Sequence, residues 1–264
     1  MYWYDGRAID KTTIELPVSD PGLTYGATVF TTLRVYESLD HRLTNWCEHC
    51  QRLETSLTAF DWQIPNWERL REGAETLLKQ YPILRIAIFP DGREWITGRF
   101  LPPDLAQRQQ GITAWIADAS LARSLAHHKT GNYLAPWLAL QHAQRFNAQE
   151  AILTDSSGNW LETSTGTLWG WHHDRWCTPP TAGILPGLVR SQLIAWLKCQ
   201  NKEVVEQLWT PALVKQFSTI AYTSCVMEII PIHTVISETA PQFYNPVHPS
   251  LQRLREYFVS ASNG

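Results

Sequence analysis

Alternating apolar and polar residues indicate several short strands along the chain. Residues 28–36 (TVFTTLRVY) alternate and are rich in β-branched and aromatic side chains, which predicts a strand with two different faces. One face carries Phe30, Thr32, Arg34 and Tyr36, and the other carries Val29, Thr31, Leu33 and Val35. The apolar sequence ILRIAIF predicts a buried strand at residues 83–89, and the P-D-G sequence after it is typical of a turn. Further strands are expected at residues 112–118, 150–154, 167–171 and 219–223.

Apolar residues at helical spacing lie between these strands. Asn45, followed three residues later by a glutamate, predicts the start of a helix. That helix is expected to bury Leu53, Leu57 and Phe60. Arg52 should be exposed at one end of it. Further helices are predicted at residues 133–146 and 188–199.

Strands and helices occur in both halves of the chain, so we predict an α/β fold with two subdomains. Paired prolines and the polar sequence QRQQG separate the halves. We therefore expect an N-terminal α/β domain over residues 1–112 and a C-terminal α/β domain over residues 113–264. A crevice between two such domains is the natural place for a bound cofactor.

The composition excludes several classes of protein. The 264 residues carry a formal net charge of −3, with 44% apolar and 18% charged residues, as in a folded globular protein. Lys and Arg are nowhere concentrated enough to neutralise a nucleic-acid backbone, and no run of about 18 apolar residues predicts a membrane span. The N-terminal sequence MYWYDGRAID lacks an apolar signal core, so the cytoplasm is the expected compartment.

Cysteines and histidines do not predict a metal centre. Cys47 and Cys50 form a CEHC sequence that could supply half of a zinc site, but no second CxxC or HxxxH pair follows. We interpret that spacing as one turn of an amphipathic helix. His127 and His128 are adjacent, and on a strand they would point to opposite faces. We expect one of them to be packed and the other to line a site.

Candidate catalytic groups are concentrated after Lys129. The segment contains, in order, the sequences KTGNY, LTDSSGNWLETSTGTLW and ILPGLVR. Lys129 offers an amine that can condense with an aldehyde, and Glu162 offers a carboxylate for a pyridine nitrogen. The L-P-G sequence opens a predicted helix, whose first amides can hold a phosphate. Together these groups meet the requirements of a pyridoxal phosphate site.

In this order the motifs resemble those of the class IV aminotransferase family, the fold type IV pyridoxal phosphate enzymes, over about residues 1–235. The resemblance implies pyridoxal 5'-phosphate as the cofactor, a small-molecule substrate and a homodimer with site residues crossing its interface. It also implies two α/β subdomains of the D-amino-acid aminotransferase-like type. The cofactor would lie in the crevice between them, with its lysine in the C-terminal domain.

The resemblance gives individual residues their expected roles. Lys129 matches the lysine that binds the cofactor aldehyde, and Glu162 matches the glutamate at its ring nitrogen. Arg52, in the sequence HCQRL, matches the arginine of an H-x-x-R-L motif that contacts the phosphate. Tyr133 matches a residue near the phenolic oxygen of the cofactor, and Leu185 matches one that packs against its ring.

Two turns are expected to complete the phosphate site. Leu188 and Val189 begin a helix, so their amides can donate to an anion. Val189 stands where the family usually has threonine, which removes one hydroxyl contact. The Y-T-S-C sequence ending at Cys225 matches the second phosphate turn of the family. There Ser224 or Thr223 could supply a hydroxyl, and Cys225 is a poorer donor.

The strand at residues 28–36 points to one reaction within the family. Aminotransferases commonly have the sequence F-E-x-x-R or Y-E-x-x-K there. The sequence FTTLR is instead similar to that of 4-amino-4-deoxychorismate lyases. Those enzymes release pyruvate to give 4-aminobenzoate for folate synthesis. Thr32 shares a face with Phe30 and Arg34, so we expect Thr32 to be a catalytic residue facing the substrate. Thr31 is expected to pack on the apolar face, where valine would be tolerated.

Two signatures of the family differ in this chain. The D-R-G-L signature of the family reads D-P-G-L at residues 20–23, and the R-G pair that usually follows the strand at residues 83–89 is missing. Arg93 or Arg99 could take over a carboxylate contact.

Three alternatives to a lyase remain at this point. The chain could instead be a class IV transaminase acting on branched-chain or D-amino acids. It could also be a homologue that binds the cofactor without catalysis, or an α/β binding protein without a cofactor.

Overall fold

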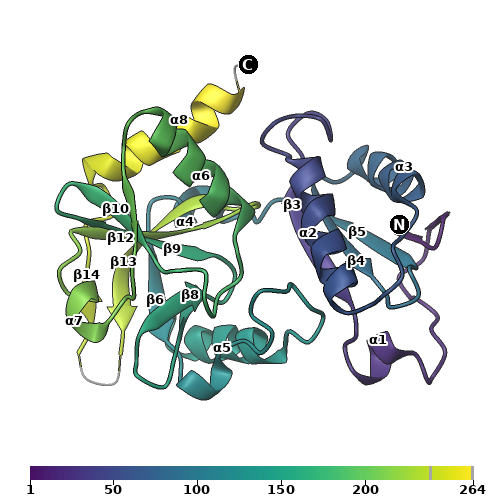
Figure 1. Cartoon of the computed structure of the whole chain (residues 1–264), viewed down its shortest axis with the longest axis horizontal. Coiled ribbons are helices and arrows are strands. Elements are labelled where there is room, and N and C mark those ends of the chain that lie inside the picture. The colour runs from purple at the N-terminus through teal and green to yellow at the C-terminus, as the bar shows by residue number, and fades with distance from the viewer. Residues whose placement is uncertain (238–239, 263–264) are drawn as a thin grey trace. The chain divides into compact units, whose positions relative to one another are not determined.

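The computed structural model describes residues 1–237 and 240–262, and this part of the chain forms two compact units (Figure 1). Unit 1 comprises Met1–Pro102 and His128–Tyr133, and unit 2 comprises Pro103–His127 and the chain from Leu134 onward. The first stretch of unit 1 thus ends before the boundary expected after residue 112, and Lys129 groups with unit 1. Residues 238–239 and 263–264 of the expected C-terminal domain lie outside the described residues.

The Lys129 segment joins unit 1 because its backbone pairs with the beginning of strand β3 (Val29–Arg34). The Phe30 amide donates to the Lys129 carbonyl over 2.7 Å, and the Gly131 amide donates to the Thr28 carbonyl over 2.6 Å. An isolated antiparallel bridge between these hydrogen bonds adds to the pairing. Just before Lys129, residues 124–127 form a turn.

Within the described residues, unit 1 is built on a five-stranded antiparallel sheet in the order β2-β1-β5-β4-β3. The strands are β1 (Tyr2–Tyr4), β2 (Arg7–Ile9), β3 (Val29–Arg34), β4 (Ile83–Ile88) and β5 (Glu94–Arg99). The helices are α1 (Pro21–Thr24), α2 (Trp46–Ala59) and α3 (Trp67–Leu78). The strands predicted at residues 28–36 and 83–89 are confirmed as β3 and β4.

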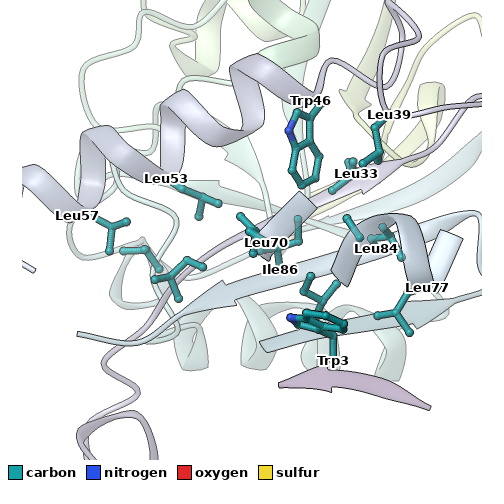
Figure 2. Close-up of a cluster of buried hydrophobic side chains, with 14 residues drawn as sticks. Trp3, Leu33, Leu39, Trp46, Leu53, Leu57, Leu70, Leu77, Leu84 and Ile86 are labelled. Carbon is teal, nitrogen blue, oxygen red and sulfur yellow. The ribbon is translucent and has the colours of Figure 1, made fainter. Parts of the chain in front are cut away.

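Apolar residues of α2 and α3 pack with alternate residues of this sheet to form the core of unit 1 (Figure 2). The cluster includes Trp3, Leu33, Leu39, Trp46, Leu53, Leu57, Leu70, Leu77, Leu84 and Ile86, each at most 8% exposed. Burying a large apolar side chain contributes about 1.5–3 kcal/mol. The two faces predicted for β3 are confirmed, because Val29, Thr31 and Leu33 are buried.

Helix α2 begins where the sequence predicts, but its N-terminal cap is different from the expected one. Asn45 is the N-cap residue with φ 56°, in the left-handed region, and its side chain makes no capping hydrogen bond. The two leucines of the prediction are buried, and Phe60 is half-buried at the C-cap. Arg52 is only partly exposed, because its guanidinium donates to the Thr31 hydroxyl of β3.

Unit 2, in its described part, is built on a mixed nine-stranded sheet in the order β11-β10-β9-β12-β13-β6-β7-β8, with β14 paired to β13. The strands are β6 (Ile112–Ile116), β7 (Glu150–Thr154), β8 (Trp160–Thr163), β9 (Thr167–His172), β10 (Arg175–Thr178), β11 (Val204–Glu206), β12 (Thr219–Ser224), β13 (Glu228–Ile236) and β14 (Gln242–Phe243). The helices are α4 (Leu105–Arg108), the 3-10 helix η1 (Ala119–Leu121), α5 (Leu134–Arg145), α6 (Leu188–Cys199), α7 (Pro211–Val214) and α8 (Pro249–Ser262).

The elements predicted for the second half of the chain are confirmed. The expected strands correspond to β6, β7, β9 and β12, and the expected helices correspond to α5 and α6. Helix α5 packs small residues against β7, where Ala139, Ala143 and Ala151 are fully buried. In the part of the chain that the structure describes, no helix combines the length and the apolar character needed to cross a membrane.

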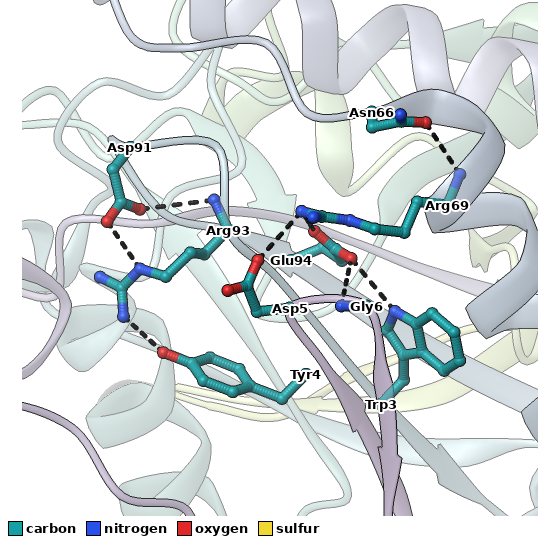
Figure 3. A network of polar contacts seen from close by, with 9 residues as sticks. All are labelled: Trp3, Tyr4, Asp5, Gly6, Asn66, Arg69, Asp91, Arg93 and Glu94. Atoms are coloured by element: carbon teal, nitrogen blue, oxygen red, sulfur yellow. Dashed lines mark hydrogen bonds and ion pairs between the residues drawn. The ribbon is translucent and has the colours of Figure 1, made fainter.

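A buried carboxylate connects the central strand of the unit 1 sheet to its neighbours (Figure 3). Glu94 on β5 is fully buried and accepts hydrogen bonds from Trp3 Nε1 at 3.1 Å, the Gly6 amide at 2.9 Å and Arg69 at 2.6 Å. Arg93, the next residue, donates to Asp91 and to the Tyr4 hydroxyl. These bonds fix the chain ends of β1 and β5 against α3.

Asp20→Asn should destabilise the protein, because buried Asp20 accepts a hydrogen bond from Arg93 at 2.6 Å. We expect a loss of about 1–3 kcal/mol in the free energy of unfolding at neutral pH. Burial alone would raise the pKa of Asp20, but hydrogen bonds from Arg93 and the Gly22 amide outweigh burial and hold that pKa below its ordinary value of 3.8. The stabilisation is therefore complete above about pH 4 and is lost as the pH falls through the folded-state pKa.

Urea titrations of the wild type and Asp20→Asn across this pH range measure the effect. The difference in the free energy of unfolding should shrink below about pH 4, where the wild-type carboxylate takes up its proton. A difference that stays constant down to about pH 2 would contradict this account of the Asp20–Arg93 pair.

Candidate active site

Lys129 lies half-buried beside two aromatic rings of unit 1. Its Nζ is 4.7 Å from the ring centroid of Phe30 and 5.5 Å from that of Tyr133. The two rings meet edge to face, with centroids 5.7 Å apart. Gly131 closes the turn behind the lysine, and a Cβ there would lie 2.2 Å from Thr28 Oγ1. The structure thus brings two predicted site residues, Lys129 and Tyr133, together on one loop.

A buried polar triad, formed by Thr31, His49 and Arg52, lies between β3 and α2. Thr31 Oγ1 is 2.5 Å from His49 Nδ1 and accepts a hydrogen bond from Arg52 Nη2 at 2.5 Å. Thr31 and His49 are at most 1% exposed. Burial, reinforced by the charges of Arg52 and Lys129, lowers the pKa of His49 well below its ordinary value of 6.5, so the ring is neutral near pH 7.

The triad corrects one expectation and adds a residue. Thr31 faces the interior as predicted, but it does not merely pack on an apolar surface, because its hydroxyl contacts two polar side chains. A valine at this position would therefore not be innocuous. His49 had no predicted role, although it is the first residue of the HCQRL sequence that identified Arg52.

The other face of the unit 1 sheet carries Thr32 and two arginines. Thr32 pairs in register with Arg85 of β4, which pairs with Thr97 of β5, and Arg99 follows two residues later on the same face. The Arg85 guanidinium lies 4.0 Å from the ring centroid of Phe30. Burial and the charge of Arg99 lower the pKa of Arg85, and burial also lowers the pKa of Arg99. Desolvated like charges of this kind are stabilised by an anion.

Unit 2 places the predicted carboxylate in a buried position. Glu162 on β8 is 4% exposed, and each of its carboxylate oxygens lies 3.4 Å from the Leu185 amide nitrogen. The Nε of buried Arg123 lies 3.7 Å from Glu162 Oε1. Arg123 thus brings a positive charge beside the buried carboxylate, which offsets part of the cost of burying it. Sequence reasoning missed Arg123 because it is far from Glu162 in the chain and belongs to no motif.

The predicted phosphate turn stands at the beginning of α6. Gly187 is the N-cap residue, and no side chain caps the helix there, so the first amides are directed outward. A Cβ on Gly187 would lie 2.4 Å from Thr167 Oγ1, so glycine permits this close approach. Val189 and Leu185 are buried, and Leu188 is half-buried. The arrangement is a cradle of backbone donors suited to an anion.

The second predicted turn lies beside the first. Thr223 of β12 pairs in register with Thr167 of β9, the residue that approaches Gly187. The Thr223 hydroxyl is buried and accepts from Trp169 Nε1 at 3.1 Å. Ser224 Oγ is half-buried and accepts from the Met227 amide at 3.2 Å, and Cys225 is also half-buried. Unit 2 therefore brings the two predicted phosphate turns together.

The cysteines and histidines considered as metal ligands form two pairs of neighbours. Cys47 and Cys50 are one turn apart on α2, as interpreted from the sequence. His127 and His128 lie in a loop, which corrects the strand assumed for them. His127 is exposed, and His128 packs on Phe60 with ring centroids 4.6 Å apart. Among the residues described by the structure, no group of three or more His, Cys, Asp or Glu side chains is arranged to hold a metal ion.

Residues 28–235 match the family described as Amino-transferase class IV. The chain belongs to the class IV aminotransferase family. The branched-chain-amino-acid aminotransferase of Escherichia coli (strain K12) is 25% identical over 276 residues, which span 88% of this chain and 84% of that protein. The aminodeoxychorismate lyase of Vibrio harveyi is 23% identical over 224 residues, which span 77% of this chain and 80% of that protein.

The class IV fold is also found in solved structures. A hypothetical aminotransferase from Mycobacterium tuberculosis, in its PLP-bound form, superimposes with a TM-score of 0.82. The match covers 99% of this chain and 98% of that chain at 20% sequence identity. The predicted α/β fold of the class IV type is thereby confirmed.

The side chains of this class IV enzyme fit pyridoxal phosphate. Lys129 has an amine next to aromatic rings, and Glu162 has a buried carboxylate of the kind that a protonated ring nitrogen requires. The cradle at Gly187 suits a phosphate, with Arg52 as the predicted guanidinium. Val189 supplies an amide but no hydroxyl, as expected from the sequence. The expected position of the cofactor in a crevice between the two subdomains stays a prediction.

Proposed function

We propose that this class IV enzyme is a 4-amino-4-deoxychorismate lyase, which releases pyruvate from aminodeoxychorismate and forms 4-aminobenzoate. Bound pyridoxal phosphate supplies a ring that accepts electrons from the substrate carbon as it loses a proton. The Lys129 amine would hold the cofactor aldehyde until the substrate amine replaces it there, and the freed Lys129 amine would then take that proton. Glu162 keeps a proton on the ring nitrogen. Arg52 and the amides of Leu188 and Val189 hold the phosphate.

The face of the unit 1 sheet that carries Thr32, Arg85 and Arg99 supports the choice of a lyase. Aminodeoxychorismate carries two carboxylates and a polar enolpyruvyl ether. Arg85 and Arg99 are partly desolvated and repel each other, so a dianion stabilises both. The aliphatic side chain of a branched-chain amino acid would desolvate the two guanidinium groups further without giving them an acceptor or a negative charge. The Thr32 hydroxyl can donate to the ether or to a carboxylate.

A transaminase acting on branched-chain amino acids is the second candidate, and similarity to the Escherichia coli aminotransferase favours it. A transaminase must move an amino group from a donor to its cofactor. L-Leucine without a keto acid would then bleach the visible absorbance of the lysine-bound cofactor, whereas a lyase has no need of this half-reaction. We expect the absorbance to persist with L-leucine and with D-alanine. Stoichiometric bleaching by either donor would favour the transaminase.

Thr32→Val should lower the rate of 4-aminobenzoate formation and leave the cofactor absorbance intact. The substitution keeps the shape of β3 but deletes a hydroxyl from the face that we assign to the substrate. We expect kcat/KM for aminodeoxychorismate to fall about 10- to 100-fold. Thr55→Val, at an exposed position of α2, serves as the matched control and should behave like the wild type. Wild-type kcat/KM in Thr32→Val would remove Thr32 from the reaction.

The assembly and compartment expected from the sequence also stay predictions. We propose that the enzyme is a homodimer, as the resemblance to class IV enzymes implies. Light scattering coupled to gel filtration would measure this directly for the full chain of 30.2 kDa.

A further inference from the structure

One hydrogen bond of the buried triad has a fixed direction. A guanidinium only donates, so Arg52 Nη2 donates to Thr31 Oγ1 over 2.5 Å. His49 Nδ1 also lies 2.5 Å from Thr31 Oγ1. A neutral His49 ring carries its proton on one of its two nitrogens, so Nδ1 accepts the Thr31 proton when the ring proton is on Nε2. In that tautomer the donation runs from Arg52 through Thr31 to His49.

Thr31 is a rigid reference point for the Arg52 side chain. It is fully buried, and its backbone position is fixed by pairing with Ile86 of β4. Arg52 extends from α2, so the orientation of its guanidinium depends on this contact with the strand. A hydroxyl accepts a hydrogen bond without cancelling the charge of the donor, whereas a carboxylate here would offset that charge.

We propose that Thr31 is a positioning residue that orients the Arg52 guanidinium toward the cofactor phosphate and leaves its positive charge available there. This inference rests on the proposed function, in which Arg52 binds the phosphate. It gives the FTT sequence two separate roles, because Thr32 faces the substrate and Thr31 acts through Arg52. An Arg52 guanidinium oriented in this way would also offset the hydroxyl contact with the phosphate that is missing at Val189.

The test compares two aldehydes that differ only in the phosphate. Full-length protein stripped of cofactor is titrated with pyridoxal phosphate and with pyridoxal, and binding is measured by quenching of tryptophan fluorescence. In Thr31→Val the affinity for pyridoxal phosphate should fall about 10- to 100-fold, while that for pyridoxal stays within about 2-fold. Thr31→Ser keeps the hydroxyl and should restore the affinity for pyridoxal phosphate to within about 3-fold of the wild type.

Two results overturn the inference. One is an equal loss of affinity for both aldehydes in Thr31→Val, which would indicate a merely structural role. The other is a Thr31→Ser variant as weak as Thr31→Val, which would show that the hydroxyl is not the cause.

Arg52→Met separates this inference from the proposed function. It should lower the preference for pyridoxal phosphate over pyridoxal, and Thr31→Val should then add nothing in the Arg52→Met background. If Arg52→Met leaves the preference unchanged, the proposed phosphate role of Arg52 fails. If Arg52→Met lowers the preference and Thr31→Val does not, only the positioning role of Thr31 fails.

Discussion

Lys129→Ala should abolish both the visible absorbance of the lysine-bound cofactor and 4-aminobenzoate formation. The amine next to Phe30 and Tyr133 is the group that we assign to the cofactor aldehyde and to proton transfer. Without it, both roles are lost together, and we expect turnover to fall by about 10⁴-fold or more. Cofactor retained through phosphate and ring contacts should be lost on dialysis as the free aldehyde. Absorbance spectra before and after dialysis, together with turnover, measure the effect.

A matched variant checks that the effect is specific to Lys129. Lys198→Ala removes an exposed lysine in the last turn of α6 and should leave spectrum and turnover unchanged. Borohydride reduction of the wild-type holoenzyme, followed by peptide mapping, should place the cofactor on Lys129. Near-normal turnover in Lys129→Ala, or a label on another lysine, would end the assignment.

Glu162→Gln should retain the cofactor but slow proton abstraction by about 10²- to 10³-fold. The carboxylate is 4% exposed, so its charge-assisted bond to a protonated ring nitrogen is poorly screened. Losing one partner of such a pair costs about 2–4 kcal/mol. A neutral amide cannot hold the nitrogen proton, and the ring then accepts electrons less well. Single-turnover measurements with aminodeoxychorismate report this step directly.

Glu203→Gln is the control for this change. Glu203 is a surface carboxylate paired with Arg175 in unit 2, and its loss should not alter the single-turnover rate. Loss of cofactor from Glu162→Gln would point to a structural rather than an electronic role. An unchanged rate would mean that another residue faces the ring nitrogen.

Features set by neighbours in the sequence could be predicted from it. Alternation over residues 28–36 predicted both faces of β3, including the burial of Thr31 and the partial exposure of Thr32. The apolar spacing after Gly187 predicted α6 with the bounds that the structure has. The L-P-G sequence likewise predicted a helix start with outward amides. Each of these depends on backbone geometry within a few residues.

Features set by contacts between distant residues could not. The Lys129 segment joins unit 1 through backbone bonds to Phe30 and its neighbours, about 100 residues earlier in the chain. The Thr31 hydroxyl contacts His49 and accepts a hydrogen bond from Arg52, and these residues lie 18 and 21 positions further along the chain. A pattern of alternation separates buried from exposed positions, but it does not show which buried position has a polar partner.

Incubation of the holoenzyme with aminodeoxychorismate, without any amino donor, tests the proposed function most directly. We predict 4-aminobenzoate and pyruvate in equal amounts over many turnovers, with the cofactor absorbance unchanged at the end. The account would be contradicted if no 4-aminobenzoate formed while L-leucine and 2-oxoglutarate were converted to glutamate.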